Sequence, residues 1–143
     1  HRVLYADLQT VIAVANSGTP AAEHVTPTAL PGLAQLTAGS LRDAHEPTNR
    51  WHNDAAFRQR YLTALGGGFS YLLLGCPALE ETHDALGLAA FLDGFVLTVQ
   101  AEHTRKGDLL RAEQMLLNAG GRLLGSVLNN TTDTAPDWAL GKR

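Results

Sequence analysis

Residues 71–77 read Tyr71-Leu72-Leu73-Leu74-Gly75-Cys76-Pro77, an apolar run that ends in a turn. Consecutive apolar residues without alternation are typical of a parallel strand that is buried on both faces. Phe95-Val96-Leu97-Thr98-Val99 is a second run of this kind, and residues 122–128 form a third. We therefore expect three strands of one parallel sheet in the second half of the chain.

Helical patterns separate these strands. Residues 81–92 and 104–118 are predicted helices, closed by Asp93-Gly94 and Gly120-Gly121. Alternating strands and helices imply right-handed crossovers and a parallel sheet. The predicted fold class is α/β, a mostly parallel sheet flanked by helices. Residues 1–143 are expected to form one domain, with a polar tail at 130–143.

The first half of the chain carries weaker signals. Arg2–Ala6 and Leu33–Leu36 are predicted strands, and the β-branched run Val11–Ala15 is interpreted as another. Asp54 is a predicted N-cap for a helix that runs to Leu65.

The amino-acid composition limits the classes of function that the chain can have. The chain has 143 residues, 45% apolar and 17% charged, with a net charge of −3. This indicates a globular domain and argues against a nucleic-acid partner. No apolar run is long enough to cross a membrane, so we expect a cytoplasmic location. Because the sequence starts at His1, we also expect that further residues precede it.

The strand ends resemble those of bacterial tyrosine kinases, the autokinases of capsule and exopolysaccharide systems and relatives of the MinD and ParA ATPases. Phe69–Ala78 resembles their Walker B strand, and Asp93–Val99 and Leu124–Asn129 follow in the family's order. Val3–Leu8 resembles the second acidic motif. The resemblance covers most of residues 30–129 and implies a P-loop NTPase fold with the three layers of MinD.

Two site residues follow from this resemblance. Asp7 corresponds to the carboxylate of the second acidic motif, which takes part in metal and catalytic chemistry. Asn129 resembles the residue that contacts the adenine. The residues alone also allow simpler interpretations, with Asp7 forming a turn after its strand and Asn129 capping a turn together with Asn130.

The departures from the family pattern matter more for the predicted function than the matches do. The 143 residues contain no Gly-Lys-Ser/Thr run, so the P-loop unit is absent from this chain. Gly75 stands at the position of the Walker B aspartate, and the family's tyrosine-rich tail is missing. A rival alignment makes Val11–Ala15 the P-loop strand and Asn16–Glu23 the loop, which has no lysine.

The sequence therefore predicts a degenerate bacterial tyrosine kinase without kinase activity, acting as a regulatory or scaffolding component of polysaccharide biosynthesis and export. We expect no cofactor, a protein partner from the export or co-polymerase system, a homo-oligomer as an option, and only indirect membrane contact at the inner face. One alternative is an ATP-binding tyrosine autokinase whose P-loop lies before His1, with ATP and Mg²⁺ as cofactors. Another is a positioning ATPase related to MinD and ParA.

Two further groups of residues contain side chains that could bind a metal or act as a nucleophile. His83 and His103 could share a metal with Glu81 or Asp84, but solvated loop histidines are the favoured interpretation, so no metal site is predicted. Cys76 could be a nucleophile with His83 as its base, although a buried small residue at a strand end is favoured.

Overall fold

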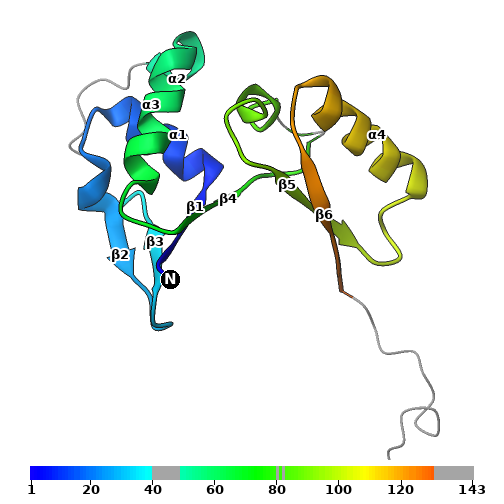
Figure 1. Cartoon of the computed structure of the whole chain (residues 1–143), viewed down its shortest axis with the longest axis horizontal. Helices are drawn as coiled ribbons and strands as arrows, with labels where there is room; N and C mark the ends of the chain where they lie inside the picture. Colours follow the sequence, from blue (N-terminus) through cyan, green and yellow to red (C-terminus); the bar gives the residue numbers. More distant parts are fainter. Residues whose placement is uncertain (40–48, 80, 82, 131–143) are drawn as a thin grey trace, which may run out of the picture. The chain divides into compact units, whose positions relative to one another are not determined.

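The computed structural model describes residues 1–39, 49–79, 81 and 83–130 (Figure 1). The chain divides into two compact units, His1–Thr82 and His83–Arg143. Both units combine parallel strands with helices, so the α/β fold class is confirmed. The expectation of one domain stays a prediction, and residues 131–143 of the expected tail lie outside the described residues.

The first unit is built on a four-stranded sheet with the order β2-β3-β1-β4. Strand β1 (Val3–Asp7) pairs in parallel with β3 (Leu33–Leu36) on one side and with β4 (Tyr71–Gly75) on the other. Strand β2 (Val25–Pro27) is antiparallel to β3 and forms the far edge. The predicted strands at the start of the chain, at 33–36 and at 71–74 are confirmed.

Helix α1 (Leu8–Ser17) follows β1 directly, so the interpretation of Val11–Ala15 as a strand was wrong. The Asp7 carboxylate accepts a hydrogen bond from the Thr10 amide at 3.1 Å and starts the helix. Gly18, at φ 75°, ends it in a left-handed conformation that favours glycine. Capping at both ends and a buried face outweigh the β preference of the branched residues. The rival alignment with a P-loop strand at this position is excluded as well.

Two helices complete the first unit. Helix α2 (Arg50–Asn53) buries Trp51, whose amide donates to the Asn16 Oδ1 atom at 2.9 Å and ties α2 to the end of α1. Helix α3 (Ala55–Gly66) begins where expected, because Asp54 Oδ1 accepts from the Phe57 amide at 2.9 Å. A short 3-10 helix, η1 (Ala21–His24), precedes β2.

The second unit contains a parallel pair, β5 (Phe95–Gln100) and β6 (Leu123–Asn129). Helix α4 (Lys106–Asn118) connects the two strands and buries Leu116. The predicted helix at 81–92 was wrong, because the described residues of this segment, 81 and 83–92, form no helix longer than the 3-10 turn η3 (Leu86–Leu88). Gly87 lowers the helix propensity in the middle of this segment.

The expectation that these apolar strands are buried on both faces was also wrong. In β4, Tyr71 is 59% exposed and Leu73 is 53% exposed, and Val96 of β5 is exposed as well. Within the described residues, β4 pairs with β1 alone, and β5 and β6 form a separate sheet of two strands. The apolar composition favours strands in these segments, but the neighbouring strands of the sheet determine how far the segments are buried.

Candidate functional site

The carboxyl ends of β1 and β4 meet at one edge of the first unit's sheet. The two strands are parallel and in register, and Asp7 lies opposite Gly75. Ligand sites of open α/β sheets lie beyond such ends. Asp7, Gly75, Cys76 and the side chain of Tyr5 form this strand end, which is the candidate site.

Asp7 is partly buried and is used as a helix cap. Its Oδ2 atom accepts from the Thr10 amide at 3.1 Å and lies 3.4 Å from the Thr10 hydroxyl, which also donates to it. The positive end of the α1 dipole favours a negative charge here. The capping role accounts for the position of Asp7 without any nucleotide, while its predicted catalytic role stays a prediction.

Tyr5 fills the space where a side chain at position 75 would lie. A Cβ atom built on Gly75 would be 2.5 Å from the Tyr5 hydroxyl oxygen and 3.1 Å from the ring carbon that carries it. Any side chain at this position therefore requires Tyr5 to move. The sequence interpretation missed Tyr5, although its position two residues before Asp7 on a strand places both on the same face.

Cys76 follows the strand end and is exposed, so the favoured expectation of a buried small residue was wrong. Partial burial of the thiol raises the pKa of Cys76, and the nearby Asp7 carboxylate raises it further. A raised pKa keeps the sulfur protonated at neutral pH. The protonated thiol is a poor nucleophile, because the thiolate is the reactive form. The alternative of a cysteine nucleophile therefore has no electrostatic support.

Asn129 is the last residue of β6 and lies opposite Gln100 of β5. Its carbonyl accepts from the Ala101 amide at 2.9 Å, and Asn130 follows at φ 55°. This backbone geometry agrees with the turn interpretation, and the adenine contact stays a prediction. Asp7 belongs to the first unit and Asn129 to the second, so the two predicted site residues are described separately.

The histidines of the metal hypothesis are exposed, and His103 contacts the carbonyl of its own loop residue Ala101 at 3.1 Å. Within the described ranges, no three side chains of His, Cys, Asp or Glu gather to hold a metal ion. No helix in the same ranges is long and apolar enough to span a bilayer.

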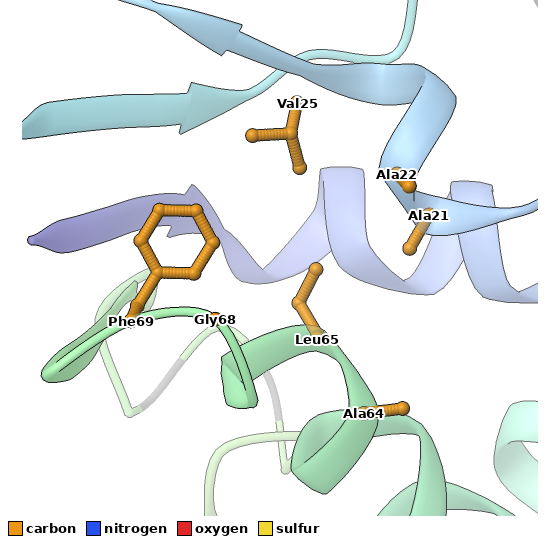
Figure 2. A pocket seen from close by; sticks show the side chains of 7 residues that line it. All are labelled: Ala21, Ala22, Val25, Ala64, Leu65, Gly68 and Phe69. Carbon is orange, nitrogen blue, oxygen red and sulfur yellow. The ribbon is translucent and has the colours of Figure 1, made fainter.

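A cavity of about 340 Å³ lies in the first unit between η1, β2 and the end of α3, as Figure 2 shows. It is lined by Ala21, Ala22, Val25, Ala64, Leu65, Gly68 and Phe69. No lining side chain carries a polar group that could orient a ligand. No sequence pattern signals this cavity, because its walls are apolar residues of separate segments.

Comparison with known proteins shows which proteins this chain is similar to. No protein-family model matches it. It is 26% identical over 120 residues to the tyrosine-protein kinase CpsD of Streptococcus agalactiae, covering 81% of this chain and 51% of that protein. This similarity supports a relationship to the bacterial tyrosine kinases. The chain spans about half the length of the curated relatives it matches.

Solved structures show that this chain has the fold of bacterial tyrosine kinase domains. The kinase domain of the Escherichia coli tyrosine kinase ETK superposes with a TM-score of 0.76 at 15% identity, covering 94% of this chain and 58% of that one. The BceF tyrosine kinase domain gives a TM-score of 0.68 at 21% identity over 89% and 55% of the two chains. A partition protein is similar at a TM-score of 0.51.

Proposed function

We propose that this chain, a relative of the bacterial tyrosine kinases, is a regulatory or scaffolding component of polysaccharide biosynthesis and export, and that it does not transfer phosphate itself. The observation that carries the proposal is the end of β4. The resemblance puts the Walker B aspartate at position 75, where the chain has a glycine and where the Tyr5 hydroxyl fills the space.

The chemistry of phosphoryl transfer explains why this matters. Mg²⁺ prefers carboxylate oxygens and water, and phosphoryl transfer depends on a metal that is held in place and on an oriented nucleophile. At this strand end a phenol hydroxyl stands where an anionic partner is needed. The remaining carboxylate, Asp7, already caps α1 through Oδ2. This donor set does not fit a magnesium–nucleotide complex.

A protein partner suits the rest of the surface better. Apolar side chains are exposed on strands of both units, including Tyr71 and Leu73 on β4 and Val96 on β5. Exposed apolar strand faces are typical of surfaces that bind other proteins. We propose that the partner is a protein of the export or co-polymerase system and that contact with the inner face of the membrane is made through that partner.

A strain that lacks the gene provides the test. We expect the wild-type protein and the Asp7→Asn variant to restore polysaccharide production equally, because asparagine caps a helix nearly as well as aspartate. Protein levels are matched by immunoblotting. Loss of production with Asp7→Asn at equal protein level would contradict the scaffold proposal.

The second candidate is an ATP-binding tyrosine autokinase, and it is favoured by the position of Asp7 at the carboxyl end of a parallel strand. In that case purified protein incubated with labelled MgATP becomes phosphorylated, and Asp7→Asn abolishes the labelling. The scaffold proposal predicts labelling at background level for both proteins. A positioning ATPase would instead dimerise only when nucleotide is added.

A further inference from the structure

A chain of hydrogen bonds joins the end of α1 to the short helix η1. The Ser17 hydroxyl oxygen lies 2.7 Å from the Val14 carbonyl oxygen and 2.7 Å from the Thr19 hydroxyl oxygen. The Thr19 hydroxyl oxygen in turn lies 2.8 Å from Nε2 of His24, and all three contacts are partly buried. We call Ser17, Thr19 and His24 the hydroxyl relay. It lies within the first unit, on the segment that connects α1 to β2.

The direction of the relay follows from the number of hydroxyl protons. A carbonyl oxygen only accepts hydrogen bonds, so the single Ser17 hydroxyl proton is donated to Val14. The proton between the two hydroxyls therefore comes from Thr19, whose amide also donates to the Ser17 oxygen at 3.2 Å. Thr19 then has no hydroxyl proton left for His24, so it accepts one from Nε2. The relay needs a hydrogen-bond donor at position 24.

Packing contributes little to the position of η1. This helix buries no residue, and its N-cap residue makes no side-chain hydrogen bond. The carbonyl oxygen of His24 accepts from the Thr37 amide at 2.9 Å, just beyond β3. Two side chains of η1, Ala21 and Ala22, line the apolar cavity together with Leu65 of α3 (Figure 2). The relay therefore links a wall of the cavity to the end of α1.

We propose that the hydroxyl relay is a latch that holds η1 closed against the end of α1, and that η1 is a movable wall of the apolar cavity. When the relay breaks, η1 loses its side-chain link to α1, and Ala21 and Ala22 move away from α3. Segments that bury few side chains are the ones that open locally in native proteins. Opening of η1 exposes the remaining walls of the cavity, which belong to β2, α3 and the residues after α3. This proposal does not rest on the absence of kinase activity.

Hydrogen exchange of the purified chain, followed by NMR, tests the latch. Thr19→Val removes the hydroxyl while nearly keeping the shape of the side chain. We expect the Val25 and Thr37 amides, which donate to carbonyls of η1, to exchange at least about tenfold faster in this variant. Thr63→Val is the matched control, because the Thr63 hydroxyl donates to a carbonyl within α3 at 2.9 Å. The control should leave the exchange of both amides unchanged.

The direction of the relay is tested at position 24. A glutamine amide donates hydrogen bonds, whereas an ionised glutamate only accepts them. We expect His24→Gln to keep the exchange of both amides close to that of the wild type, and His24→Glu to match Thr19→Val. Nitrogen-15 NMR of the wild type at about pH 8.5, where an unperturbed histidine is neutral, should show the His24 proton on Nε2. This measurement tests the relay even where a variant fails to fold.

Three results would overturn the proposal. One is a His24 proton on Nδ1, because Nε2 would then be the acceptor. Another is equal exchange rates in His24→Gln and His24→Glu, which would show that no donor is needed. The third is a Thr19→Val variant in which the two amides do not both exchange faster than in Thr63→Val, because η1 would then not move as a unit. Faster exchange of both amides in Thr19→Val and His24→Glu alone supports the latch.

Discussion

Strands β1 and β4 are hydrogen-bonded neighbours, but the less apolar of the two strands is the more deeply buried one. Strand β1 reads VLYAD, includes a carboxylate, and has Leu4 and Ala6 fully buried. Strand β4 reads YLLLG, is more apolar, and leaves two large side chains more than half exposed. The difference is that, in the part of the chain that the structure describes, β1 pairs on both edges and β4 on one. Position in the sheet, more than apolar content, sets the burial of a strand.

The largest expected effect is on the buried strand. Leu4→Ala should lower the free energy of unfolding by about 3 kcal/mol, because it leaves a cavity around a side chain with no exposed area. Leu73→Ala should cost less than about 1 kcal/mol, measured by urea denaturation of both variants at the same protein concentration. Equal losses in the two variants would contradict the comparison.

The next effect is at the end of β1. Asp7→Ala should destabilise the first unit by about 1 kcal/mol, because it removes the cap of α1, whereas Asp7→Asn should cost much less. Asp54→Ala is the matched control, since Asp54 caps α3 through a hydrogen bond of 2.9 Å. If Asp7→Ala leaves the urea midpoint unchanged while Asp54→Ala lowers it, the carboxylate does not serve as a cap.

The smallest expected effect concerns a buried hydroxyl. The Tyr61 Oη atom is buried and has no hydrogen-bond partner among the residues that the structure describes, so Tyr61→Phe should raise stability by up to about 1 kcal/mol. Burial raises the pKa of Tyr61 from 10.0 to about 12. Folding therefore favours the protonated form, and wild-type stability should fall as the pH rises from about 10 towards about 12.

Denaturation curves collected across this alkaline range measure the effect. The decline should be shallower in Tyr61→Phe than in the wild type. Both proteins should carry Cys76→Ser, because the pKa of Cys76 is also raised and its ionisation would add to the slope. Parallel slopes in the two proteins would show that Tyr61 is not responsible.

Local signals in the sequence were sufficient to predict several helices and strands. The apolar runs at 71–74 and 95–99 are strands, and Asp54 begins a helix as predicted. The run Val11–Ala15 led to a wrong strand prediction, because β-branched residues also occur on the buried face of a short helix. Capping by Asp7 favours the helix at this position. The edge position of β4 could not be predicted, since it depends on strand order.

The candidate site was predicted only in part. The departure at Gly75 could be recognised from the family pattern alone. The contact between Tyr5 and the space beside Gly75 could not be predicted, because it depends on the register of two strands 68 positions apart, with Tyr5 opposite Leu73 and Asp7 opposite Gly75. The cap formed by Asp7 became visible only once α1 was known to begin at Leu8.

Calorimetric titration of MgATP and MgADP into the purified protein tests the central claim most directly. The account predicts no measurable heat of binding at high micromolar protein, because the end of β4 lacks the carboxylate and Tyr5 fills its space. Micromolar binding that is lost in Asp7→Asn would contradict it and would return the chain to the ATP-binding kinases.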